Sequence, residues 1–186
     1  MSATSFKVTF KLDEDDARYF RALFRKAKQT ATDQDPEEIL SAARALVASV
    51  RRSKKTPGFV LEAIDTLQDL TEIIEDKDYA APAKIRNDVI GALAYFANAE
   101  DLIPDDIPVL GFLDDAIMIK FVEEQFKHEL KGFRKFRKFR SGAEQRPWTS
   151  VASERLPGRL AAMRAKLRAE IERKNRADQD RGRGGF

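Results

Sequence analysis

The stretch YFANAEDLIPDDIPVLGFLDDAI, residues 95–117, places five aspartates and one glutamate among prolines and large apolar side chains. Pro104 and Pro108 each lack a backbone N–H and restrict the residue before them, so a continuous helix cannot run through this stretch. Asp101 and Asp105 are placed to accept hydrogen bonds from the backbone N–H groups that the break leaves free. The stretch therefore predicts a turn between two helices, and this interpretation needs no ligand.

The same carboxylates offer a second interpretation, a site for a hard cation such as Mg²⁺ or Ca²⁺. Asp114 and Asp115 fall in the first turn of the next helix, where the helix dipole favours carboxylates. The spacing is not that of an EF-hand loop, and adjacent side chains on a helix diverge by about 100°. We favour the structural interpretation, and we keep a metal-binding protein or metal-dependent hydrolase as an alternative. Its candidate ligands are Asp101, Asp105, Asp114 and Asp115.

The spacing of this stretch resembles the core signature of the YkvA family, a bacterial domain of unknown function. The resemblance is carried by Tyr95, DLIPD (101–105), IPVLG (107–111) and LDD (113–115). It implies a small helical module with this loop at its centre, and it implies no particular activity or ligand. Glu100 stands where many relatives have an apolar residue, and the flanking helices are more charged than in relatives whose segments look membrane-buried. A membrane role is therefore not carried over to this chain.

The rest of the chain predicts an all-α fold, a bundle of five to six helices with one short N-terminal β-strand. Apolar side chains recur every three or four residues in six segments. The segments cover about 13–28, 35–50, 56–74, 82–99, 111–140 and 153–175. We divide the chain into a strand-helix-helix N-terminal region (1–50), a YkvA-like helical core (51–140), a basic C-terminal helix (141–175) and a disordered tail (176–186).

Residues 6–12, FKVTFKL, alternate strictly between apolar and polar side chains, which predicts a half-buried strand. A lone strand must find a partner for its backbone hydrogen bonds. We expect Phe6, Val8 and Phe10 to pair with the same strand of a second copy, giving a homodimer. Strand, helix and helix in this order also resemble the ribbon-helix-helix repressors, but the acidic residues 13–16 oppose the approach of phosphates. Pairing without DNA is therefore the better interpretation.

Charge is distributed unevenly along the chain, whose formal net charge is +3. Residues 131–186 hold 17 Lys/Arg and 6 Asp/Glu, whereas residues 1–130 hold 17 and 25. A basic arm on an acidic body indicates either a polyanionic partner or an arm that folds back on its own body. The second arrangement would cancel the charge argument.

The segment KGFRKFRKFR, residues 131–140, interleaves aromatic and basic side chains. On a helix its phenylalanines form one stripe. This stripe either docks on the core or stacks on nucleic-acid bases, in which case the flanking Lys and Arg side chains contact phosphates. An anionic membrane surface would suit the same pattern. The candidate polyanion-binding residues are Lys131, Arg134, Lys135, Arg137, Lys138, Arg140, Arg164, Lys166 and Arg168.

Other chemistry is sparse in this sequence. The chain has no cysteine, and its single histidine, His128, is predicted to be solvated. The last helix carries a narrow apolar seam from Leu156 to Ile171, which would suit one partner helix. We predict a cytoplasmic, non-catalytic binding or regulatory module that engages nucleic acid through its basic arm, with no cofactor and no small-molecule substrate. The alternative is a protein-interaction module that docks through the last helix.

Overall fold

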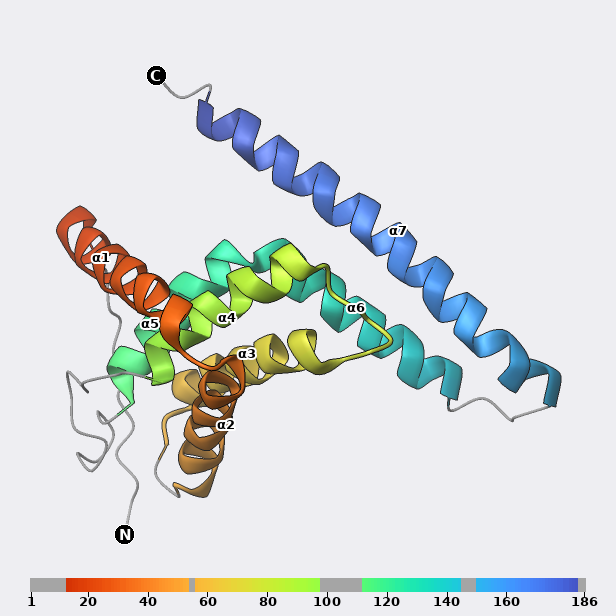
Figure 1. The fold of residues 1–186 in the computed structure, drawn as a ribbon, viewed down its shortest axis with the longest axis horizontal. Coiled ribbons are helices and arrows are strands. Elements are labelled where there is room, and N and C mark those ends of the chain that lie inside the picture. The colour runs from red at the N-terminus through yellow and green to blue at the C-terminus, as the bar shows by residue number, and fades with distance from the viewer. Residues whose placement is uncertain (1–12, 54–55, 98–111, 145–149, 184–186) are drawn as a thin grey trace, which may run out of the picture.

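The computed structural model describes residues 13–53, 56–97, 112–144 and 150–183, which form seven α-helices and one 3-10 turn (Figure 1). The helices are α1 (Glu14–Thr30), α2 (Pro36–Arg52), α3 (Gly58–Glu75), α4 (Ala83–Ala97), α5 (Leu113–Gln125), α6 (Lys127–Glu144) and α7 (Ser150–Arg183), with η1 (Ala31–Asp33) after α1. The predicted all-α bundle is confirmed for these residues. The predicted strand, with Phe6, Val8 and Phe10, lies outside them.

The first two helices begin where the sequence predicts, because their N-terminal N–H groups receive side-chain partners. Asp13 accepts hydrogen bonds from the backbone N–H groups of Asp15 and Asp16, and the Asp16 carboxylate accepts from the Asp13 N–H. Asp35 caps α2 by accepting a hydrogen bond from the backbone N–H of Glu37, with Pro36 at the first helical position. Each cap of this kind stabilises the start of its helix by about 1 kcal/mol.

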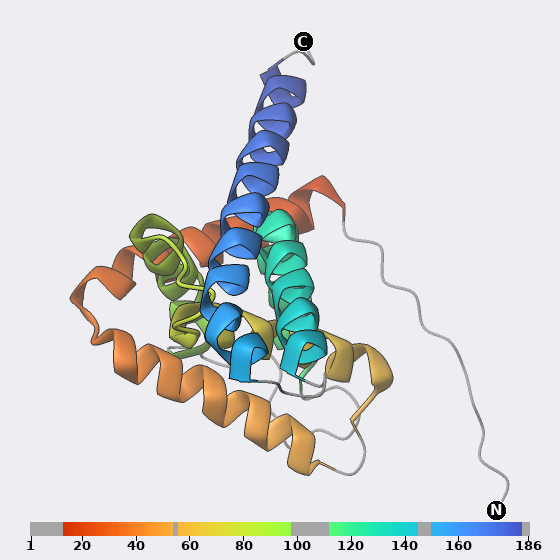
Figure 2. The same ribbon diagram turned by 90° about the vertical axis from the view of Figure 1, so that its right-hand side faces the viewer.

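Helix α3 lies at the centre of the bundle and packs against α2, α4, α5 and α6 (Figures 1 and 2). Leu67 and Leu70 are completely buried, as the apolar spacing of this segment predicts, and Ile73 is completely buried beside them. Two polar residues of the same helix, Thr66 and Asp69, are also buried and face α6. A buried carboxylate needs a charged or hydrogen-bonding partner, and α6 supplies it.

The expected count of five to six helices is wrong, because the predicted 111–140 helix is divided at Phe126. This residue has φ −104° and ψ 16°, although its N–H still donates to Val122 O at 3.0 Å. The Phe126 side chain is buried, so the break adds one more ring to the core. The non-helical backbone at this residue also rotates the faces of α6 relative to those of α5. Neither proline nor glycine marks the break, and helical periodicity alone therefore could not locate it.

Helices α6 and α7 form an antiparallel hairpin on one side of the bundle (Figures 1 and 2). The seam of α7 is buried through Leu160, Leu167 and Ile171, and it packs against α6 of the same chain. The boundaries differ from those predicted, since α7 starts at Ser150 and continues to Arg183. The predicted disordered tail is corrected for residues 176–183, which are helical; contacts of Asp178 with the start of α6 anchor this end.

None of the helices that the structure describes is both long enough and apolar enough to cross a membrane.

Candidate functional site

Of the four aspartates proposed as cation ligands, two lie within the residues that the structure describes and two lie outside them. Asp101 and Asp105 lie outside the described residues. Asp114 and Asp115 lie in the first turn of α5, as predicted, and both are buried. No group of three or more metal-ligating side chains occurs among the residues that the structure describes. The cation site therefore stays a prediction.

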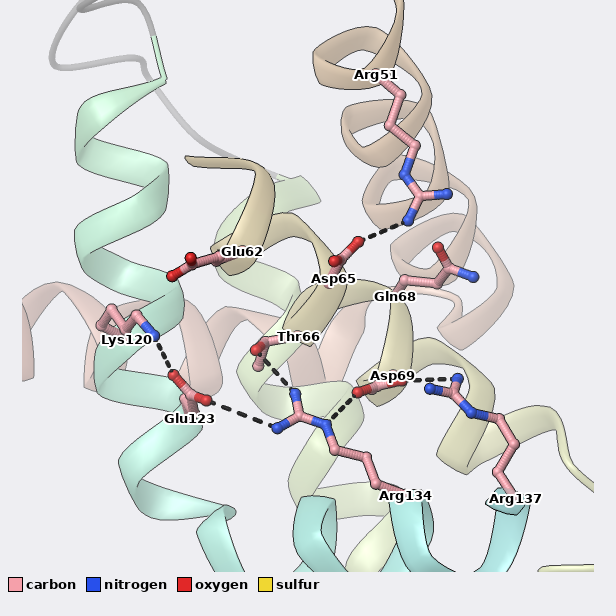
Figure 3. Close-up of a pocket in the computed structure, with 10 residues that line it drawn as sticks. All are labelled: Arg51, Glu62, Asp65, Thr66, Gln68, Asp69, Lys120, Glu123, Arg134 and Arg137. Carbon is pink, nitrogen blue, oxygen red and sulfur yellow. Dashed lines mark hydrogen bonds and ion pairs between the residues drawn. The ribbon is translucent and has the colours of Figure 1, made fainter. Parts of the chain in front are cut away.

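Two arginines of the basic segment point into the body and bind one buried carboxylate of α3 (Figure 3). Arg134 donates from Nε to Asp69 Oδ2 at 2.5 Å and from Nη2 to Thr66 Oγ1 at 3.1 Å. Arg137 Nη1 lies 2.8 Å from Asp69 Oδ1 and 2.8 Å from Glu72 Oε2. These guanidinium groups hold α6 against α3, and their charge is compensated by the acidic body.

Arg140 repeats this arrangement one turn further along α6. Its Nη2 lies 2.8 Å from Asp76 Oδ2, and its Nη1 donates to Asp78 Oδ2 at 3.2 Å. Burial alone would raise the pKa of Asp76, but hydrogen bonds from Arg140 and from the backbone N–H groups of Tyr79 and Asp78 hold it below its ordinary value. The pair thus fastens the C-terminal end of α3 to α6.

An open cleft of about 510 Å³ lies where α2, α3, α5 and α6 approach one another (Figure 3). Its ion pairs include Arg51 with Asp65 at 2.8 Å and Lys120 with Glu123 at 2.6 Å. Cationic and anionic side chains line it in equal numbers, so it offers no excess charge of either sign to a ligand. We therefore interpret the cleft as a structural ion-pair network.

A buried charged cluster joins α7 to α6 and to the connection between α3 and α4. Glu129 Oε1 accepts hydrogen bonds from Tyr79 Oη at 2.8 Å and from Arg168 Nη1 at 2.6 Å. The Arg168 guanidinium also lies over the Tyr79 ring, 4.4 Å from its centroid. Burial, together with the neighbouring Glu129 carboxylate, raises the pKa of the Tyr79 hydroxyl. Within the described part of the chain, Glu129 Oε2 and Arg168 Nε and Nη2 are buried without a hydrogen-bonding partner.

The nine candidate polyanion-binding residues divide by residue type. All five arginines are engaged with the protein itself, including Arg164, which donates to the Asp78 carbonyl oxygen at 3.0 Å. The four lysines are Lys131, Lys135, Lys138 and Lys166, and all of them are exposed. A planar guanidinium matches a carboxylate with two parallel donors, whereas an ammonium group is a strongly hydrated point charge. The structure thus pairs all five arginines with groups of the protein itself, whereas Lys131, Lys138 and Lys166 are exposed without an ion pair among the described residues.

The outward cations of the two helices share one side of the hairpin. Lys135 Nζ on α6 donates to Glu170 Oε1 on α7 at 2.9 Å, which joins the two helices at this point. Positions four residues before and three residues after each bridge residue lie on the same helical face. These positions carry Lys131 and Lys138 on α6, and Lys166 and Arg173 on α7. We call these four cations, together with Lys135, the basic face.

The phenylalanine stripe of the basic segment faces the core. Phe133 and Phe136 are completely buried, and their ring centroids lie 5.0 and 5.4 Å from that of Tyr79. Phe139 is half-buried, with the Arg159 guanidinium 5.5 Å from its ring centroid. The sequence leaves open whether this stripe packs on the core or stacks on nucleic-acid bases, and the geometry supports packing on the core.

The prediction of a solvated His128 is wrong. Its Nε2 lies 2.9 Å from Asp178 Oδ2, and only 18% of its side chain is exposed. The hydrogen bond with His128, followed by that with Lys127, holds the pKa of Asp178 below its ordinary value. The two residues are 50 positions apart in the sequence, so no local pattern could have indicated this contact.

An apolar groove of about 370 Å³ that the sequence did not indicate lies between the start of α3 and α5. Phe59, Ile117 and Phe121 line it, and 44% of Phe59 is exposed. Phe20 of α1 stacks on Phe121 at the edge of the groove, with a centroid distance of 5.5 Å. Nothing in the structure identifies what would cover this groove.

Comparison with known families agrees with the resemblance inferred from the aspartate stretch. Residues 89–121 match the family described as "Protein of unknown function (DUF1232)", a segment that includes the end of α4 and most of α5. The YkvA-like resemblance is thereby confirmed for this segment. No curated protein and no solved structure matches the chain.

Proposed function

We propose that this protein is a non-catalytic, cytoplasmic nucleic-acid-binding module whose α6–α7 hairpin contacts phosphates through the basic face. The observation that carries the proposal is the separation of the cations into two groups. The arginines compensate the acids of the body, whereas Lys131, Lys138, Lys166 and Arg173 have no ion pair among the residues that the structure describes. Clustered cations without internal partners are the usual contacts for phosphate groups.

The charge that is available for a ligand is smaller than the sequence suggests. Much of the basic arm folds back on the acidic body, so the large excess of Lys and Arg in residues 131–186 cannot be counted in full. Glu170 adds a carboxylate to the middle of the face. Hydrogen bonds from Lys174 and then from Lys135 lower its pKa to about 2, so this carboxylate is ionised at neutral pH. The proposal therefore relies on the four cations that flank the bridge.

Nucleic acid is favoured over a membrane surface because the basic face lacks apolar anchors. Interfacial helices insert large apolar side chains beside their cations. The exposed large apolar residues of the described chain are Tyr19, Phe59 and Leu61, which belong to α1 and α3 and not to the hairpin. Docking of a protein partner through the α7 seam is disfavoured because α6 already covers that seam.

Binding of labelled oligonucleotides, followed by fluorescence anisotropy, tests the proposal. For four phosphate contacts the slope of log K against log salt is about −3.6, so affinity should fall roughly a hundredfold between about 50 and 200 mM salt. The double variants Lys131→Glu/Lys138→Glu and Lys166→Glu/Arg173→Glu should each bind at least about tenfold more weakly, because each replaces two contacts by repulsion.

A matched control is available on another face of the molecule. Arg25 and Lys26 of α1 are exposed, and their reversal to glutamate changes the net charge by the same amount. This control should keep the wild-type affinity, and thermal melting should show that all three variants remain folded. Absence of binding at low salt, or an equal loss in the α1 control, would refute the proposal.

Homodimer formation through residues 6–12 remains a separate proposal, motivated by the alternating pattern of that segment.

A further inference from the structure

Among the residues that the structure describes, none on the basic face carries an aromatic side chain on which a base could stack. Proteins that bind single strands combine a cationic groove with exposed aromatic rings, and each stacked base contributes about 1–3 kcal/mol. Here Phe133 and Phe136 are completely buried, Phe139 is half-buried beside Arg159, and α7 contains no aromatic residue. A single strand would therefore gain only its phosphate contacts on this face.

The face is also poor in groups that distinguish bases. Sequence reading in a groove uses planar donors, above all arginine, asparagine and glutamine. Arg134, Arg137 and Arg140, which lie on α6 between the lysines, are held by carboxylates of α3 and the residues that follow it. Arg173 is the one free guanidinium of the face, and the other three free cations are flexible ammonium groups, which supply charge without a fixed hydrogen-bonding geometry. Contacts of this kind go to the phosphate backbone and carry no sequence information.

The four free cations outnumber the phosphate charges that a single strand presents over the same length, but not those of a duplex. Lys131 and Lys138 lie seven residues apart on α6, as do Lys166 and Arg173 on α7, which corresponds to about 10 Å along each helix. Over about 10 Å a duplex presents roughly six phosphate charges, whereas a single strand at B-form spacing presents roughly three. All four cations of the two rows can therefore be paired on a duplex, whereas a single strand would leave at least one of them unpaired.

On the basis of the proposed function, we infer that the basic face binds double-stranded nucleic acid through its phosphates and without regard to base sequence. The inference names the class of ligand for the same site: two backbones held against a rigid helical hairpin. The Lys135–Glu170 bridge contributes by keeping the two rows at a constant distance.

Equilibrium binding to matched ligands tests this inference. The probes are an oligonucleotide of about 20 nucleotides with little self-pairing, the duplex of the same length, and a second duplex of unrelated sequence, all at about 50 mM salt. The duplex should bind about tenfold or more tightly than the single strand, and the two duplexes should differ by less than about threefold. Phe139→Leu, which removes the one half-buried ring of the stripe, should leave both affinities unchanged.

The outcomes separate the inference from the proposed function. A single strand that binds as tightly as the duplex, or a single-strand affinity that falls in Phe139→Leu, overturns the inference while nucleic-acid binding stands. A large difference between the two duplexes also overturns it, because cations that contact only phosphates cannot produce such a difference. Failure of every probe to bind at low salt overturns both.

Discussion

The buried pair between Glu129 and Arg168 should respond very differently to single and double substitution. Arg168→Met keeps the length and apolar stem of the side chain but removes the cation that faces the Glu129 carboxylate. The side chains of Glu129 and Arg168 are 4% and 17% exposed, respectively, so the carboxylate would be left almost fully buried. Breaking a buried pair in this way costs about 3–5 kcal/mol. Because Tyr79 Oη still donates to Glu129, we expect a loss of about 3 kcal/mol, the low end of this range.

The double variant Glu129→Gln/Arg168→Met should recover most of this loss. The side-chain amide oxygen that this variant carries at position 129 can still accept from Tyr79, and the unpartnered atoms of Arg168 are no longer present. Replacing both members of a buried pair is often close to neutral, so the double variant should lie within about 1 kcal/mol of the wild type. Glu129→Gln alone should cost about 1–2 kcal/mol, because the amide oxygen at position 129 can still accept the hydrogen bond from Arg168 Nη1.

Urea unfolding followed by far-ultraviolet circular dichroism measures the free energy of unfolding of all four proteins. Hydrogen exchange of the α6 and α7 amides then shows whether the loss is concentrated at this interface. A cost below about 1 kcal/mol for Arg168→Met would contradict the reasoning, and so would a double variant as unstable as Arg168→Met.

Three further results are expected. Gly132→Ala would place a Cβ 2.6 Å from Ile171 Cδ1 and 3.2 Å from its Cγ1, so it should destabilise the hairpin by about 1 kcal/mol. Gly142→Ala, in open space on the same helix, should instead stabilise it by about 0.5–1 kcal/mol. Thermal melts that rank the two variants the other way would contradict the packing. Because the folded pKa of Asp76 lies below its unfolded value, its contribution is complete above an unfolded pKa of about 3.9 and is lost as the pH falls through the folded pKa. Asp76→Asn should therefore be less stable than the wild type at pH 7, and urea titrations should show this difference shrinking in acid; a gap that is constant with pH would disprove the linkage. For the aspartate stretch, the favoured structural interpretation predicts no change in melting temperature with millimolar Mg²⁺ or Ca²⁺, and a metal-dependent rise that disappears in Asp105→Asn would instead establish a cation site.

Local features of the fold could be predicted because their causes lie within a few residues. The start of α2 near residue 35, and the apolar spacing of α3, are set by the hydrogen-bonding needs of a helix start and by the helical period. The break at Phe126 and the helical state of residues 176–183 were missed for the converse reason. The break has no local marker, and the helical end is anchored by a contact between His128 and Asp178.

The candidate site shows the same division. The sequence by itself determined that the chain is helical and that residues 131–140 carry one apolar stripe flanked by Lys and Arg. It also determined that residues 131–186 are basic while residues 1–130 are acidic. It did not determine which Lys and Arg side chains remain available to a ligand, because Arg134 and its partner Asp69 are 65 positions apart and meet only when α6 packs on α3. Tertiary packing sorted the cations, since buried carboxylates require charged partners and the planar guanidinium supplies the better geometry. The lysines were left to the solvent-facing side of the hairpin, and the proposed function relies on that outcome.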